Sequence, residues 1–184
     1  LSRTEADDAM FPRRGWSLFL GFHGARDGLM ADTSFSQLRG RGSVVLPLGP
    51  RLRLLGRLEA GSSFLSPSRQ LPASERFFAG GARSVRGYRY QALGPTNTAG
   101  DVVGGRHLLV SSVEAEWRVW GRWGIAGFYD AGNAANDWPP EPLAGAGGGL
   151  RWASPIGMIR LDYAVPLDRQ REDWRIHFSM GPDL

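Results

Sequence analysis

The sequence predicts an all-β protein that forms an antiparallel transmembrane β-barrel, and three observations support this. Large apolar and polar residues alternate with a period of two, and Gly or Pro interrupts almost every window in which a helix could form. The alternating segments are about ten residues long, the length of a strand that crosses a bilayer at a tilt. A soluble sandwich or barrel also alternates and fits the same pattern, but its strands are usually shorter. The chain is rich in aromatic residues (7 Trp, 9 Phe and 4 Tyr in 184), and five tryptophans lie on the apolar face or near segment ends, as in the girdles of membrane barrels: Trp16, Trp117, Trp123, Trp152 and Trp174.

Three strands are expected in the first third of the chain, at residues 14–24, 34–48 and 51–64. In the first, the even positions from Trp16 to Phe22 are large and apolar. The second carries Arg39 and Arg41 on one face. The third places Arg and Glu at odd positions and Leu at even ones. Each segment therefore has one apolar and one polar face.

Five further strands are expected, at residues 106–120, 123–133, 144–154, 156–166 and 172–181. The first two carry Glu114 and Asp130 on the polar face. The third is rich in glycine, which lets a neighbouring segment pack closely. The fourth alternates Arg160 and Asp162 with apolar residues. The last brings one apolar face together, formed by Trp174, Ile176, Phe178 and Met180.

The link 65–105 is too long for a simple turn, because structureless loops beyond ~12–15 residues are uncommon unless they are functional or disordered. Its aromatic residues argue against disorder. An eight-stranded barrel is filled by its own side chains and has no room for such a loop. Nor does it have room for the inward arginines Arg39, Arg41, Arg53, Arg57, Arg118, Arg151, Arg160 and Arg175. We therefore expect residues 1–12 to be an entry segment and 13–184 to be part of a larger barrel. The other strands would come from upstream sequence or from a second copy.

Composition argues against an enzyme. Cysteine is absent, which excludes disulfides and thiol chemistry, and the three His lie on separate segments without metal-ligand spacing. The segment GAGGGL at 145–150 lacks the last glycine and the strand–helix context of a dinucleotide loop. No catalytic residue, cofactor or metal is therefore predicted. Nucleic-acid binding is not expected either, because the arginines alternate with leucines instead of clustering with exposed aromatics.

Four ordered motifs resemble the outer-membrane assembly and translocation superfamily, which includes BamA, TamA and the two-partner secretion transporters. RFFAGGARSVRGY at 76–88 resembles its lumen-loop motif, and VSSVE at 110–114 resembles the strand that follows. FYDAG at 128–132 and PIGMIRLDYAVPL at 155–167 resemble two later strand motifs. The tail HFSMGPDL at 177–184 is most similar to TamA.

This resemblance implies a sixteen-stranded barrel in the outer membrane of Gram-negative bacteria, preceded by POTRA modules, with this chain as its C-terminal half. The implied function is insertion or translocation of client proteins through a lateral gate, without a cofactor. The implied partners are the lipid bilayer, client β-barrel or autotransporter proteins, the upstream barrel half with its POTRA modules, and an inner-membrane partner. The alternative from another class is a passive pore or solute channel, which a homodimer of this chain could form.

The resemblance also implies that the long link folds into the lumen, where Arg86, Gly87 and Tyr88 form a lock with acids on the wall. The alternation supports this independently, because it places Glu114 and Asp130 on the inward face of adjacent strands. A planar guanidinium can bridge two carboxylates. Paired Gly80 and Gly81 permit backbone conformations with positive φ, and Gly87 lets the backbone turn tightly beside Arg86.

The terminal strand, with Trp174, Ile176, Phe178 and Met180, is expected to form one side of the gate, where its free edge can pair with a client strand. The same four residues would equally suit an ordinary lipid-facing strand.

Overall fold

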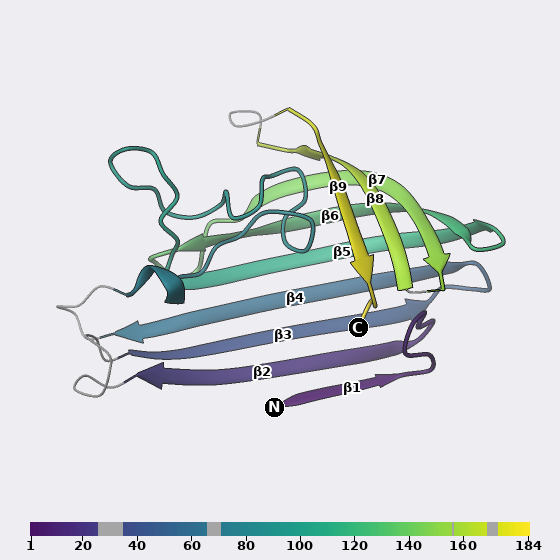
Figure 1. The fold of residues 1–184 in the computed structure, drawn as a ribbon, viewed down its shortest axis with the longest axis horizontal. Helices are drawn as coiled ribbons and strands as arrows, with labels where there is room; N and C mark the ends of the chain where they lie inside the picture. The colour runs from purple at the N-terminus through teal and green to yellow at the C-terminus, as the bar shows by residue number, and fades with distance from the viewer. Residues whose placement is uncertain (26–34, 66–70, 156, 169–172) are drawn as a thin grey trace.

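The computed structural model describes residues 1–25, 35–65, 71–155, 157–168 and 173–184. Within them, nine strands form a single antiparallel sheet in chain order (Figure 1). This confirms the predicted all-β antiparallel architecture. The strands are β1 (Ser2–Ala6), β2 (Gly15–Ala25), β3 (Phe35–Pro47), β4 (Leu52–Leu65), β5 (His107–Trp120), β6 (Trp123–Ala135), β7 (Leu143–Ser154), β8 (Gly157–Pro166) and β9 (Arg175–Gly181). A short 3-10 helix, η1 (Ala73–Glu75), begins the described part of the long link. Among the described residues, no helix is long and apolar enough to cross a membrane.

The structure adds one strand to the eight that the sequence predicts. Strand β1 lies in the entry segment and pairs with β2, with Ser2 opposite Phe19 and Ala6 opposite Gly15. Its residues are small or charged, so the sequence shows no apolar face there that would predict a strand. Trp174 precedes β9 instead of lying in it. Residues 34, 156 and 172, at the starts of expected strands, and 66–70 of the expected loop lie outside the described residues.

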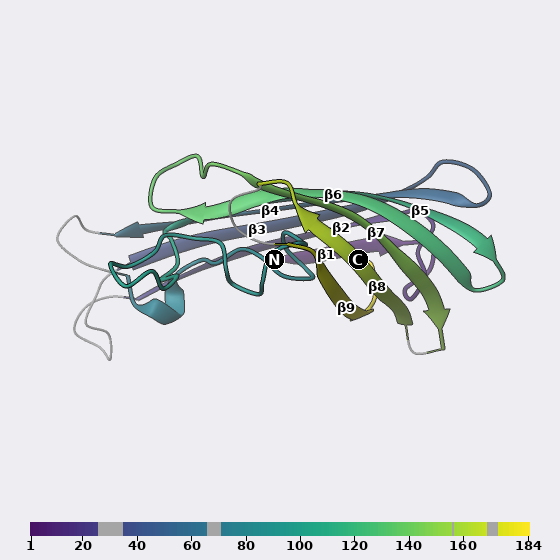
Figure 2. The same cartoon turned by 90° about the horizontal axis from the view of Figure 1, so that it is seen from above.

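The sheet curls into a trough whose concave side holds the long link. Figures 1 and 2 show β8, β9 and the link on the same side of the strands β2–β5. Strands β1 and β9 are the two edges of this sheet. The short turns 48–51 and 121–122 lie at one end of the strands, and the long link joins β4 to β5 at the other end (Figure 1).

The two faces of the sheet have opposite polarity. In β5, Glu114 and Glu116 on the concave side are 6% and 5% exposed, whereas Val113 and Trp117 on the convex side are 51% and 53% exposed. A water-soluble sheet would bury its valines and expose its glutamates. The exposed apolar residues continue over β2–β9, including Leu20, Phe22, Val44, Leu58, Phe64, Ile125, Tyr129, Leu150, Leu161, Tyr163, Ile176 and Phe178. The convex face therefore has the composition of a lipid-facing surface.

If the convex face contacts lipid, its tryptophans will be quenched by brominated acyl chains. Trp117 and Trp123 lie on this face, and Trp123 stacks on Trp152 with ring centroids 5.6 Å apart. In vesicles of brominated lipid we expect most of the fluorescence to be lost, and Trp117→Phe should reduce the quenched component. Efficient quenching by aqueous iodide, with no effect of brominated lipid, would contradict a lipid-facing surface.

The concave side contains a small apolar core between the long link and the wall. Phe77, Val85, Tyr88 and Leu93 from the link pack with Leu108 and Val110 of β5 and Ala134 of β6. Val85 and Tyr88 are 0% and 1% exposed. The link is thus folded against the inner wall, and this positions the residues that it carries.

Candidate functional site

The described part of the long link is held by backbone pairing at its base. The Phe77 and Gly105 backbones donate to each other at 2.9 and 2.8 Å, and Ala79 and Leu93 exchange two bonds of 3.0 Å. Gly80 and Gly81 have φ values of +101° and +103°, which favour glycine. A Cβ on Gly80 would stand 2.4 Å from the carbonyl oxygen of Arg89. Both glycines are therefore needed for the turn that brings residues 85–88 to the wall.

Arg86 is the centre of the site and is 1% exposed. Its Nε and Nη2 donate to the two carboxylate oxygens of Asp130 at 2.7 and 2.9 Å, and its backbone N–H donates to Asp130 Oδ2 at 3.0 Å. Its Nη1 donates to Glu114 Oε2 at 2.6 Å and to Asp162 Oδ2 at 3.1 Å. One loop residue thereby joins three strands, β5, β6 and β8.

The surroundings keep Arg86 charged. Burial opposes its ionisation, but hydrogen bonds and charge from Asp130 and Glu114 outweigh it, so the pKa of the guanidinium is raised above its ordinary value. The guanidinium carbon also lies 3.4 Å from the ring centroid of Phe128, within the range of a cation–π contact. A Lys would offer neither the fork nor the stacking plane.

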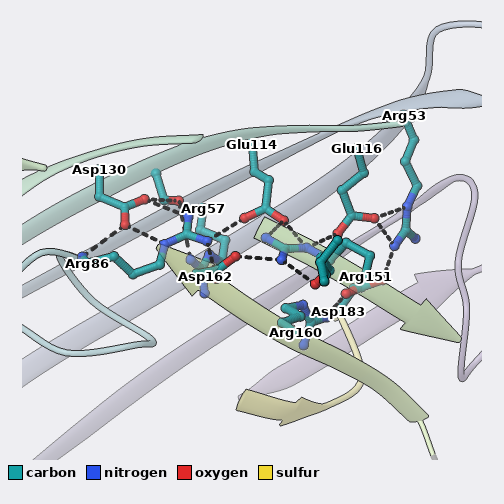
Figure 3. Close-up of polar contacts among 12 residues, drawn as sticks. Arg53, Arg57, Arg86, Glu114, Glu116, Asp130, Arg151, Arg160, Asp162 and Asp183 are labelled. Atoms are coloured by element: carbon teal, nitrogen blue, oxygen red, sulfur yellow. Dashed lines mark hydrogen bonds and ion pairs between the residues drawn. The ribbon is translucent and has the colours of Figure 1, made fainter. Parts of the chain in front are cut away.

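The contacts of Arg86 belong to a larger buried network, which we call the lumen charge cluster (Figure 3). Arg151 donates to Glu114 Oε1 at 2.6 Å, to Asp162 Oδ1 at 2.5 Å and to Glu116 Oε1 at 3.1 Å. Arg53 donates to Glu116 Oε2 at 2.8 Å. The cluster comprises Arg53, Arg86, Glu114, Glu116, Asp130, Arg151, Arg160, Asp162 and Asp183. Because each of these charges has an opposite partner, the cluster can be buried without leaving an isolated ion.

The two residues that follow Arg86 also hold the loop, through contacts that involve no charge pair. Gly87 has a φ of +98°, and a Cβ there would stand 2.9 Å from the backbone nitrogen of Pro166. Its N–H donates to Nε2 of His177 at 3.0 Å. The Tyr88 hydroxyl donates to the carbonyl oxygen of Ala144 at 3.2 Å.

The glycine-rich strand β7 makes room for the cluster. A Cβ on Gly145 would stand 1.9 Å from the carbonyl oxygen of Arg86, and one on Gly149 would stand 2.1 Å from Oδ1 of Asp162. A Cβ on Gly147 would meet the Phe128 ring at 2.7 Å. These distances agree with the close-packing interpretation of this segment and leave no role for a dinucleotide loop.

The structure brings Arg86, Glu114 and Asp130 into direct contact, with Gly87 and Tyr88 beside them. The four residues of the expected gate lie elsewhere: Trp174, Ile176, Phe178 and Met180 are exposed on the convex face. Sequence reasoning did not include Asp162, Arg151 and Glu116 in the lock. The period-two alternation places all three on the polar face of their strands, but it does not show that they lie close to Arg86.

The site has the chemistry of a structural lock. Its carboxylates accept from guanidiniums within the chain, and Ser112 Oγ donates to Asp130 Oδ1 at 2.6 Å. Among the described residues, no group of three or more His, Cys, Asp or Glu is arranged to hold a metal ion. The arrangement can fix a loop inside the trough and couple it to several strands.

Comparison with known proteins identifies the family. The model of the Omp85 superfamily domain matches residues 1–183. The outer membrane protein assembly factor BamA of Nitratidesulfovibrio vulgaris is 33% identical over 146 residues, which cover 73% of this chain and 18% of that protein. The BamA of Neisseria meningitidis serogroup B is 24% identical over 221 residues, covering 97% of this chain and 27% of that protein.

The fold also matches a solved structure. The crystal structure of Haemophilus ducreyi BamA lacking POTRA domains 1–3 superposes with a TM-score of 0.79 at 20% identity, over 95% of this chain and 41% of that one. The chain thus spans less than a third of the length of the two BamA relatives. Their names describe outer-membrane assembly factors, in agreement with the predicted location and with a non-enzymatic role. The TamA-type assignment stays a prediction. The chain belongs to the Omp85 superfamily.

Proposed function

We propose that this chain is the C-terminal barrel part of a TamA-type factor that assembles or translocates client proteins at the outer membrane of a Gram-negative bacterium. The whole protein would comprise POTRA modules and an upstream part of the barrel, whose strands would join the nine described strands of this chain to complete a sixteen-stranded barrel. The observation that carries an assembly role is the anchoring of a long loop to the inner wall through Arg86, Asp130 and Glu114, and the TamA type rests on the resemblance of the tail at 177–184.

The loop held in the interior favours an assembly factor over a passive channel. A channel requires an open, hydrated path. Here Val85, Arg86 and Tyr88 are almost completely buried on the concave side of the sheet, and the cluster neutralises arginines that would otherwise attract anions. The interior of this chain is built to hold a loop in place.

Strand β9 is suited to receive a client strand. It is an edge of the sheet, and its seven residues pair with β8 from Met158 opposite Gly181 to Ala164 opposite Arg175. An edge strand presents unpaired backbone groups that can template a further strand. Its outward Ile176 and Phe178 would lie in lipid, where an inserting client strand must also place its apolar residues.

The proposed clients are β-barrel or autotransporter proteins, and an inner-membrane partner would follow from the TamA-type assignment. The turns 48–51 and 121–122 would face the periplasm, because outer-membrane barrels have short periplasmic turns and longer extracellular loops.

Crosslinking tests whether β9 receives clients, and the chain has no cysteine that would interfere. Phe178→Cys in the whole protein should crosslink during assembly to a client that carries one cysteine in its terminal strand. Leu161→Cys is the matched control, because Leu161 lies opposite Phe178 in the register, on the same face but in β8. Equal crosslinking at the two positions, or none at Phe178, would refute a role of β9 as the client-receiving edge.

A further inference from the structure

We propose that the lumen loop holds the terminal strand β9 as well as the wall, and that His177 is the positioning residue that makes this hold depend on protonation. The inference rests on the proposed function, in which β9 is the client-receiving edge. The wall contacts of Arg86 involve β5, β6 and β8.

Two contacts join the loop to β9. The backbone N–H of Gly87 donates to Nε2 of His177 at 3.0 Å. The Arg83 guanidinium donates through Nη2 to the carbonyl oxygen of Met180 at 3.1 Å. Residues 83 and 87 flank Arg86, so the segment that is anchored to the wall also contacts β9 near its middle and near its C-terminal end.

The Gly87 contact requires a neutral imidazole. An imidazole nitrogen accepts a hydrogen bond only while it carries no proton, and the imidazolium form has donors at both nitrogens. A backbone N–H cannot reverse its role, so protonation of His177 removes this bond. The unperturbed titration of His lies near pH 6.5, so the protonation state of an imidazole can be changed under mild conditions.

The charged groups around His177 do not replace it as the acceptor for the Gly87 N–H. Those that face it are Arg86 of the loop, Asp130 of β6, Asp162 of β8 and Arg175 of its own strand. Asp162 lies opposite His177 in the register, but its two oxygens already accept from Arg86 and Arg151. A proton on His177 would therefore break the loop contact and add a positive charge beside Arg86.

The consequence is a terminal strand whose stability depends on the loop. Within the described residues β9 pairs with β8 alone, and in the whole barrel its other neighbour would be an upstream strand, so the loop contacts add to the strand pairing that holds β9. Loss of the His177 contact should loosen β9 while the bonds of Arg86 to Asp130 and Glu114 keep the loop on the wall. Protonation of His177 would therefore loosen β9 and leave the loop bound to the wall.

Hydrogen exchange of the whole protein in detergent, compared at pH 8 and pH 5 after correction for intrinsic rates, tests the inference. We expect the amides of 175–181 in the native sequence to exchange about fivefold faster at pH 5, the effect of one lost hydrogen bond. His177→Gln keeps an uncharged acceptor and should give the same protection at both pH values. His177→Leu should exchange fast at both. His107→Gln, in β5, is the matched control and should keep the pH dependence of the native sequence.

Protection of β9 that is unchanged in His177→Leu at pH 8 would overturn the inference, as would a pH dependence that persists in His177→Gln. Arg83→Gln provides a second test, since it removes the Met180 contact without a titrating group and should loosen β9 equally at both pH values. Client assembly is measured separately. A failure of the proposed function would abolish crosslinking to β9 while leaving the exchange result intact, so the two failures are distinguishable.

Discussion

Arg86→Ala is expected to release the lumen loop and to abolish most assembly activity. The variant leaves Asp130, which is 0% exposed, without its guanidinium partner, and it takes from the buried Glu114 one of its two arginine partners, the other being Arg151. Breaking a buried ion pair from one side costs about 3–5 kcal/mol, because an uncompensated charge remains. Trypsin can report the release, since Arg83 and Arg89 flank the site. Trypsin should cut the peptide bonds that follow Arg83 and Arg89 rapidly in the variant and slowly in the native protein.

Two further variants show whether the effect is specific to this guanidinium. Arg86→Lys retains the charge but not the fork that reaches Asp130 and Glu114 together, so it should recover only part of the protection. Arg122→Ala removes an exposed arginine in the turn between β6 and β5 and should behave as the native protein. Slow cleavage at Arg83 and Arg89 in Arg86→Ala, with normal assembly, would show that the ion pairs do not hold the loop.

Gly145→Ala is expected to displace the loop although it changes no charge. The added Cβ would stand 1.9 Å from the carbonyl oxygen of Arg86 and 3.5 Å from that of Val165. Neither atom belongs to a flexible side chain, so the loop itself must shift. Overpacking costs about 1–3 kcal/mol or more, and here the shift would also stretch the bonds of Arg86 to Asp130. The variant should therefore show fast tryptic cleavage of the loop and reduced assembly.

Gly127→Ala is the matched control for this substitution. Gly127 lies in the adjacent strand β6, and the nearest atom to a Cβ there is 4.0 Å away, the carbonyl oxygen of Gly147. The loop of the Gly127→Ala variant should be as protected from trypsin as the loop of the native protein. If Gly145→Ala and Gly127→Ala behaved alike, the close approach of the loop to β7 would be disproved.

The period-two alternation was sufficient to predict eight of the nine described strands and the two faces of the sheet, because side-chain direction in a strand follows directly from position. It placed Glu114 and Asp130 inward, and resemblance to known lumen loops added Arg86. Strand β1 was missed because its residues are small or charged, so no apolar face distinguishes it from a polar segment. Its pairing with β2 depends on backbone hydrogen bonds, which any residue except Pro can make.

The extent of the charge cluster was beyond sequence reasoning for a different reason. Alternation says that Asp162 and Arg151 face inward, but it does not say that β8 curls far enough to meet a loop anchored on β6. That proximity depends on the curvature of the sheet and on the missing side chains of Gly145 and Gly149. The same applies to His177, whose contact with Gly87 joins residues 90 positions apart.

A double-mutant cycle on Arg86 and Asp130 tests the central claim, that one loop arginine locks the loop to the inner wall. The free energy of loop opening would be measured by tryptic cleavage in the whole protein for Arg86→Ala, Asp130→Ala and the double variant. The account predicts strong non-additivity, with a coupling of about 1.5–3 kcal/mol, because either single change already breaks the pair. Additive effects of the two substitutions would contradict it.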